Sequence, residues 1–314
     1  MKQIDKMLDK VDDYQRKHIV PGFIYSIIKK NSQDNGGYLT AVITYYSFLS
    51  LFPMLIVLTS LTKLILGNNS YLKNKIVGSA AHYFPITGSQ LQYSIHSPKQ
   101  TGIALIVSLI ITFYGARGVA NVLQYSLSSI WYVPHYKNPS FINNLVRSFS
   151  IMIFGGIGLL ISSVVSGYTA IPGNAVFDRL LTLVASFLLL WLTFTFVFKF
   201  SIAGTVKIKQ ILVSALLTAL GLQIFQTLGT LIMVHELKGL NSIYGTFALV
   251  VGLLFWIYLQ TKVLLYAVGV DVIRYYHLYP RSLRGKQTVA DKAAYKHQNM
   301  TYQKRVEEKI DPKF

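Results

Sequence analysis

The apolar stretch from Tyr244 to Val272 restricts the fold of this chain more than any other feature of the sequence. It carries one charge in its middle, Lys262, and one acidic residue close to its end, Asp271. A helix needs about 20 mainly apolar residues to cross the hydrocarbon core of a bilayer. The stretch is long enough for this, so it predicts a transmembrane helix.

Five further apolar stretches precede it, and together they predict an all-α, polytopic membrane protein with six transmembrane helices. The predicted spans cover about residues 39–66, 101–122, 145–165, 180–200, 208–234 and 244–272. The second span is the weakest, because Arg117 follows a short apolar run. Only 13% of the residues are charged, whereas a soluble domain carries about 25%, so much of the chain avoids water.

The placement of basic residues predicts the orientation. Most of the 30 lysines and arginines lie in the two terminal segments and in the second and fourth connections between spans. Cytoplasmic connections of membrane proteins carry such an excess. We therefore expect a cytoplasmic amphipathic segment (1–38), a transmembrane domain (39–273) with an external loop (67–100), and a basic cytoplasmic tail (274–314).

The net charge of +18 raises the question of a nucleic-acid partner. A nucleic-acid-binding protein gathers its basic residues on one face or stripe. Here they flank the apolar spans instead, a pattern typical of contact with the anionic headgroups of membrane lipids. We expect lipids as partners and no nucleic acid, and the sequence leaves a homo-oligomer open.

The sequence offers little for catalysis. It has no cysteine, which excludes disulfides and thiolate metal sites. Its seven histidines show no metal-ligand spacing, and neither a P-loop nor a G-x-S-x-G element is present. His235 and Glu236 form one adjacent acid–base pair, for which a solvated turn is the commoner setting. We therefore expect no metal, no cofactor and no enzymatic activity.

The terminal segments predict different structures. Met7 and Val11, together with Ile4 and Leu8, recur at helical spacing before Pro21. They fit either an interfacial helix on the cytoplasmic leaflet or a helix packed on cytoplasmic loops. The tail after Gly285 is polar and basic, and we expect it to be partly disordered.

Polar stripes run along three of the spans. Thr44 and Ser47, with Thr40 and Ser50, share one face of the first span, and Pro53 after them is a candidate hinge. Gln223, Gln226 and Thr227 share a face of the fifth span. Either set could line a hydrated cavity or form hydrogen bonds between helices. In the third span Gly155, Gly158, Ser162 and Ser166 predict close helix packing.

Lys262 is the sharpest single candidate for a binding residue. A lysine in mid-bilayer is costly and usually faces a protein interior or water. Tyr258 and Tyr266 lie on its face one turn away. With Arg117, Lys262 could attract an anionic group such as a lipid phosphate; the alternative is a snorkelling or paired lysine. We expect Asp271 to pair with a basic residue near the cytoplasmic surface.

Three segments of the chain resemble the YihY/BrkB family of membrane proteins. Residues 44–53 (TYYSFLSLFP) resemble the signature of its first span, and residues 126–131 (SLSSIW) its second motif, often A-L-N-x-I-W. Residues 244–271 resemble its last span, which commonly ends G-A-E. The residues that carry the resemblance are Tyr45, Ser50, Pro53, Trp131, Tyr244, Gly245, Gly269 and Asp271. Ser128, Asp271 and Lys262 depart from the usual asparagine, glutamate and small or neutral residue.

This resemblance implies a six-helix protein of the bacterial inner membrane. Members were long labelled ribonuclease BN, some are linked to virulence or serum resistance, and some have been proposed to move lipids or envelope precursors. The residues described above give no support to the ribonuclease label. We expect a transporter or flippase-like protein for an anionic or amphipathic envelope molecule. The alternative is a non-transporting membrane scaffold in envelope assembly.

Overall fold

The computed structural model describes residues 2–66, 102–133, 141–167, 176–203, 206–236, 245–283 and 287–310. Its helices are α1 (Lys2–Lys17), α2 (Ile19–Gln33), α3 (Gly36–Leu66), α6 (Gly102–Ile130), α7 (Phe141–Gly167), α8 (Val176–Ser201), α9 (Leu212–Glu236), α10 (Gly245–Tyr275) and α11 (Val289–Ile310), with a short 3₁₀ turn η4 (Ile208–Gln210) before α9. The described residues contain no strand, which confirms the all-α prediction. The predicted external loop 67–100 lies outside the described residues.

Six long helices, α3 and α6 to α10, match the six predicted spans in order and extend most of them by a few residues. The largest difference is in α6, which continues past the predicted end at 122 to Ile130. Arg117 does not terminate the helix, because a charged side chain can lie within a helix. The helix ends where Tyr132 takes a positive φ of 55°, the left-handed conformation that commonly ends helices.

Three of these helices are long and apolar enough to cross a membrane within the part of the chain that the structure describes. Their apolar windows are Ile142–Leu159, Leu180–Ser201 and Val250–Tyr275, and α9 contributes a shorter one, Leu212–Gln226. Many of their large apolar side chains, such as Leu188, Leu192 and Phe255, are exposed. Such outward apolar faces are what lipid, rather than water, would solvate.

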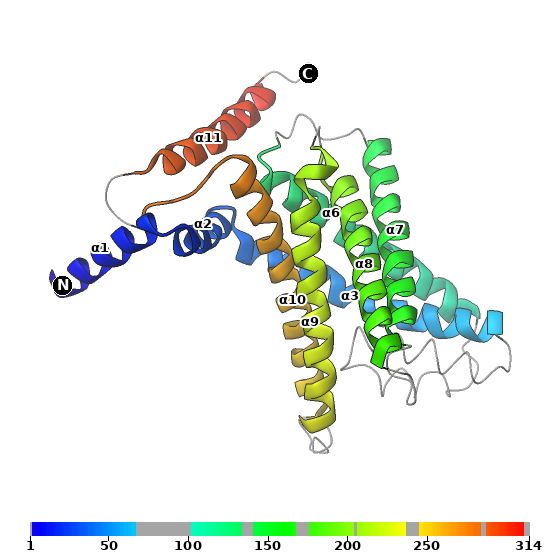
Figure 1. The fold of residues 1–314 in the computed structure, drawn as a ribbon. Coiled ribbons are helices and arrows are strands. Elements are labelled where there is room, and N and C mark those ends of the chain that lie inside the picture. Colours follow the sequence, from blue (N-terminus) through cyan, green and yellow to red (C-terminus); the bar gives the residue numbers. More distant parts are fainter. Residues whose placement is uncertain are drawn as a thin grey trace.

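Neighbouring long helices pack as antiparallel pairs: α3 with α6, α7 with α8, and α9 with α10. Figure 1 shows α8, α9 and α10 side by side, and α10 also contacts α3. The largest core cluster lies where α6, α8, α9 and α10 meet, and includes Leu127, Phe198, Ile211 and Val272. Because the helices alternate in direction, their ends gather at two opposite ends of the bundle.

Glycines allow two of these pairs to approach closely. A Cβ built on Gly115 of α6 would lie 2.6 Å from the Cβ of Ser50 in α3, and one on Gly118 would clash with the ring of Tyr46. In the second pair, a Cβ on Gly158 of α7 would clash with Thr193 of α8. The structure thus confirms the packing role predicted for Gly158 in the third span, and the side chain of Ser166 lies outside the described residues.

The terminal helices lie together at one end of the bundle, the end where α10 finishes (Figure 1). The break between α1 and α2 falls at His18, which has extended backbone. Pro21 lies in the first turn of α2, where its missing N–H costs nothing. Within the polar and basic tail, residues 289–310 form the helix α11, which was not predicted from the sequence.

Candidate functional site

The polar stripe of α3 is bonded within its own helix. The Thr40 hydroxyl donates to the Gly36 carbonyl at 2.6 Å, and the Thr44 hydroxyl to the Thr40 carbonyl at 2.8 Å. Ser50 donates to the Ser47 carbonyl at 3.0 Å. Thr and Ser in helices commonly bond back to the preceding turn in this way. These hydroxyl groups therefore need neither water nor a neighbouring helix as a hydrogen-bond acceptor.

The side chains of the first family motif, residues 44–53, point to different sides of α3. Tyr46 lies against Gly118 of α6, whereas Tyr45 is exposed and meets the Tyr46 ring edge-on at 5.5 Å. Ser47 is half-buried. Helix α3 continues through Pro53 to Leu66, and the side chain of Pro53 lies outside the described part of the structure.

The glutamines of α9 lie near its contact with α10. Gln226 is only 2% exposed and Gln223 is half-buried. Beside them, the ring of Phe225 meets that of Trp256 edge-on, with centroids 5.6 Å apart. The side chain of Thr227 lies outside the described residues. The amide of Gln226 is thus a buried polar group on α9.

Lys262 is half-buried on α10. Its Nζ lies 5.4 Å from the centroid of the Tyr258 ring one turn earlier, within reach of a cation–π interaction. Tyr266 is half-buried one turn later. Arg117 is half-buried on α6, a helix that contacts α10. The sequence-predicted residues of α6 and α9 are therefore carried by helices that each contact α10.

Asp271, the last acidic residue of the family motif, joins α10 to the start of α9. Its carboxylate is 5% exposed and accepts the backbone N–H of Ser214 at 2.7 Å. Ser214 is in the first turn of α9, so an acidic group meets the positive end of the helix dipole. Arg274 lies 3.8 Å from the other oxygen. The predicted pairing of Asp271 with a basic residue is confirmed, and the helix cap is an addition.

The second family motif joins the end of α6 to the end of α8. The Ser128 hydroxyl accepts the Ala203 N–H at 3.0 Å and lies 3.5 Å from the Ser201 carbonyl. Three residues on, Trp131 is buried, with its ring centroid 5.9 Å from that of Tyr275. The hydroxyl at position 128 therefore bridges two helix ends, which an asparagine amide could also do.

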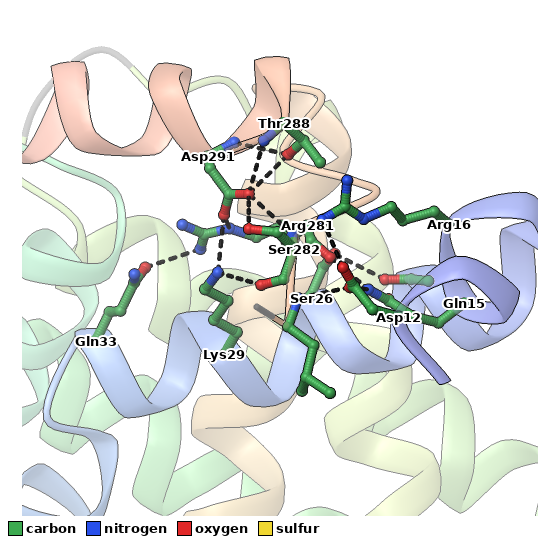
Figure 2. Close-up of polar contacts among 12 residues, drawn as sticks. Asp12, Gln15, Arg16, Ser26, Lys29, Gln33, Arg281, Ser282, Thr288 and Asp291 are labelled. Carbon is green, nitrogen blue, oxygen red and sulfur yellow. Dashed lines mark hydrogen bonds and ion pairs between the residues drawn. The ribbon is translucent and has the colours of Figure 1, made fainter. Parts of the chain in front are cut away.

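Asp291 is the centre of a buried polar cluster between the two ends of the chain (Figure 2). One oxygen accepts from Lys29 Nζ at 2.9 Å and from Arg281 Nε at 3.2 Å. The other accepts the N–H and hydroxyl of Ser282 and of Thr288, at 2.6–3.1 Å. Burial alone would raise the pKa of Asp291, but the bonds from Ser282, Lys29 and Thr288 hold the pKa far below its usual range.

Arg281 and Asp12 extend this cluster onto α1 and α2. Arg281 is only 1% exposed; it donates to Gln33 Oε1 at 2.8 Å, and its carbonyl accepts Gln15 Nε2 at 2.6 Å. Asp12 accepts the Leu283 N–H at 2.7 Å. We call the whole set the terminal junction; it comprises Asp12, Gln15, Lys29, Gln33, Arg281, Ser282, Thr288 and Asp291. It fixes α1 and α2 to the segment that leads into α11.

Helix α11 also lies on aromatic side chains at the ends of α6 and α10. The ring centroid of His297 lies 5.6 Å from that of Tyr132 and 4.5 Å from that of Tyr276. On the other side, Lys30 Nζ lies 4.1 Å above the Tyr132 ring and pairs with Asp34 at 2.8 Å. The aromatic contacts of His297 thus help to fix α11, a helix that is polar in sequence.

Sequence reasoning missed the terminal junction. One signal was available, because Thr288 and Asp291 have the T-x-x-D spacing of a capping box, and Asp291 N–H donates to the Thr288 hydroxyl at 3.1 Å. Nothing in the sequence around Arg281 predicts that its side chain is buried. The described residues hold no group of three or more His, Asp or Glu arranged for a metal ion.

The remaining residues of the family motifs, Tyr244, Gly245 and Gly269, belong to the last predicted span. Gly245 is the first residue of α10 and Tyr244 lies outside the described residues. Gly269 is buried, yet a Cβ there would meet no atom within 4 Å, so packing within the described part of this chain does not require a glycine.

Comparison with known proteins supports the resemblance carried by these motifs. Residues 27–291, most of the chain, match the family described as virulence factor BrkB. The matched range begins inside α2 and ends at Asp291, so it includes all six long helices and much of the terminal junction. No curated protein and no solved structure matches the chain. The chain belongs to the virulence factor BrkB family and is a membrane protein built from apolar α-helices.

Proposed function

We propose that this protein moves an anionic or amphipathic envelope molecule across the bacterial inner membrane, and that it does so without catalysing a chemical reaction. The observation that carries the proposal is Lys262, a cation half-buried in an apolar helix beside the Tyr258 ring. A charge within an apolar transmembrane helix is costly, so an ionisable residue there usually has a function. A phosphate or carboxylate passing through the protein would supply that function.

Two further observations support a polar path along the same helices. Gln226 is buried in α9, and α9 packs against α10. Arg117 is half-buried on α6, which also contacts α10. A headgroup with a negative charge and hydrogen-bonding oxygens would match a lysine, an arginine and a glutamine amide. The polar stripe of α3 contributes less, because the hydroxyl groups of Thr40, Thr44 and Ser50 bond within their own helix.

The proposal includes an orientation in the inner membrane. The two terminal segments lie at one end of the bundle (Figure 1) and are joined by the terminal junction. Because cytoplasmic segments carry the excess of lysine and arginine, we place this end in the cytoplasm. Six crossings, with α3 leaving the cytoplasm and α10 returning, complete the arrangement.

Transport by the purified protein in proteoliposomes tests the proposal. Lys262→Ala and Gln223→Leu should each reduce the movement of a fluorescent anionic lipid between leaflets by roughly tenfold, which corresponds to about 1.4 kcal/mol in the barrier. Lys209→Ala, the same change at an exposed lysine before α9, is the matched control. Unchanged lipid movement in both span variants would contradict the site.

A scaffold in envelope assembly is the second candidate, and one observation favours it. The α3–α6 and α7–α8 contacts are tight enough that Gly115, Gly118 and Gly158 leave no room for a methyl group. A bundle packed in this way suits a rigid platform better than a protein that opens. One measurement distinguishes the two candidate functions. If the protein is a scaffold, the unaltered protein should move no lipid between the leaflets of vesicles.

A further inference from the structure

Helices α1 and α2 present an apolar face that stays largely exposed in the described chain. The face consists of Met7, Val11 and Tyr14 of α1 and Val20, Ile24 and Ile28 of α2, and we call it the outer face. These side chains are 52–71% exposed. At 3.6 residues per turn, positions 20, 24 and 28 lie on one side of α2, so the outer face follows from the sequence spacing.

The opposite side of the same two helices is occupied. Lys29 and Gln33 reach Asp291 and Arg281 across the terminal junction (Figure 2). Asp12 is bonded to the Leu283 N–H. The junction therefore fixes the rotation of α1 and α2 and leaves the apolar side outward. Figure 1 shows α11 beyond the α1–α2 pair, at the very end of the molecule.

We infer that α1 and α2 form an in-plane membrane anchor, whose outer face inserts among the acyl chains of a leaflet rich in anionic lipid. Helices with one apolar and one charged side lie in the bilayer interface in this manner. The anchor is separate from transport and requires only that the bundle is in a membrane.

Two observations favour lipid over a second protein chain as the occupant. Tyr38 and Tyr45 on α3, the helix that follows α2, are exposed as well. Tyrosines gather at the interfaces of membrane proteins. In addition, Lys10 and Lys17 are exposed on the flank of the outer face of α1, where they can meet lipid phosphates.

The absence of native cysteine makes a direct test practical. A single nitroxide is attached at Ile24→Cys or Val11→Cys in the full-length protein, in nanodiscs of phosphatidylglycerol and phosphatidylcholine. Collision with oxygen, which is concentrated in the bilayer, is compared with collision with a water-soluble nickel complex. Asp13→Cys, on an exposed acidic position of α1, is the matched control.

The anchor predicts oxygen-favoured collision at positions 11 and 24 and nickel-favoured collision at position 13. Replacing phosphatidylglycerol with phosphatidylcholine, or introducing Lys10→Glu with Lys17→Glu, should shift positions 11 and 24 toward nickel-favoured collision.

Nickel-favoured collision at these positions in the anionic nanodisc would overturn the anchor. So would shielding from both reagents with dipolar broadening, the sign of a second copy. Equal readings in both lipids would overturn the role of anionic headgroups. Lys262→Ala should change none of these readings, so a failed transport proposal remains distinguishable.

Discussion

Asp271 is almost fully buried near the end of α10, and its carboxylate caps the first turn of α9 through the Ser214 N–H. A free N–H at a helix start is one of several that the helix itself cannot bond. An acceptor from the neighbouring helix satisfies it and fixes the two helices in register. The family motif thus has a structural reason at this position in addition to any role in transport.

Removing the acceptor should therefore cost more than removing its charge. Asp271→Leu leaves the Ser214 N–H buried without a partner, a loss of about 1–3 kcal/mol. Asp271→Asn keeps an oxygen there and should cost less. Arg274→Gln, which changes a more exposed partner 3.8 Å from the carboxylate, is the control. Thermal melting in detergent measures the order, and equal melting temperatures for Leu and Asn would contradict the cap.

His297 gives α11 a pH dependence. Burial lowers the pKa of His297, and the cations of Lys296 and Lys30 lower it further. The ordinary pKa is about 6.5, so the undocked helix binds a proton before the docked helix does. Docking is then fully stable above that value and weakens as the pH falls below it.

Amide exchange of α11 between pH 8 and pH 5, corrected for the intrinsic rate, checks this dependence. We expect protection to decrease below about pH 6.5 in the unaltered protein and to stay level in His297→Gln. The Asp291 carboxyl does not contribute in this window, because its pKa lies far below it. A decrease of the same size in both proteins would show that another group is responsible.

At the scale of elements, the close contacts of glycine explain how apolar helices hold together. Lipid gives two apolar helices no hydrophobic reason to associate, so close packing must supply the attraction. Gly158 lies against the β-branched side chain of Thr193, which has little freedom to move. Ser162 adds a hydrogen bond to the Ser186 carbonyl at 3.1 Å in the same α7–α8 contact.

Gly158→Ala should destabilise the protein by about 1–3 kcal/mol, the usual cost of overpacking. Gly156→Ala, two residues away on the same helix, is the matched control, since a Cβ there meets nothing within 4 Å. It should be neutral or slightly stabilising, because alanine is the better helix former. Chemical or thermal unfolding in detergent distinguishes them, and the reverse order would contradict the described α7–α8 contact.

The order and approximate extent of the six long helices could be predicted from the sequence, because each is marked by its own apolar residues. The end of α6 could not be predicted, because the helix ends at Tyr132 through a positive φ that no strong sequence signal indicates. Helix α11 was missed for a different reason. Its composition is polar, and part of its stability comes from contact with Tyr132 and Tyr276, of which Tyr132 lies far away in the sequence.

The candidate residues for binding were only partly predictable. A lysine and two glutamines can be recognised in the sequence because they interrupt stretches of apolar residues. Their neighbours cannot be recognised, since these depend on helix rotation and on which helices pair. The same holds for Arg281, an ordinary tail residue in sequence that the structure buries among partners from α1, α2 and α11.

At the scale of the whole molecule, the terminal junction makes the two ends of the chain one unit. Asp291→Asn removes the charge that Arg281 and Lys29 share. Breaking a buried ion pair costs about 3–5 kcal/mol, and partial exposure of Lys29 places the expected cost below that range. We expect amide exchange in α2 and α11 to rise by at least about tenfold, which corresponds to about 1.4 kcal/mol of local opening.

Exchange in α7 and α8 should stay unchanged in that variant, because neither helix contributes a residue to the terminal junction. Asp13→Asn, at an exposed carboxylate one residue from Asp12, is the matched control and should leave all four helices unaffected. Faster exchange throughout the bundle would mean that Asp291 supports the global fold and not a local connection between the termini.

We propose that a lipid-solvated bundle of six crossings keeps both termini in the cytoplasm. Single cysteines at Asp13 in α1, at Gln298 in α11 and at Ser97 in the predicted external loop test it most directly in intact spheroplasts, since the chain has no native cysteine. A membrane-impermeant maleimide should label position 97 at once and positions 13 and 298 only after the membrane is permeabilised. Labelling of position 13 or 298 in the intact spheroplasts, with position 97 protected, would contradict the account.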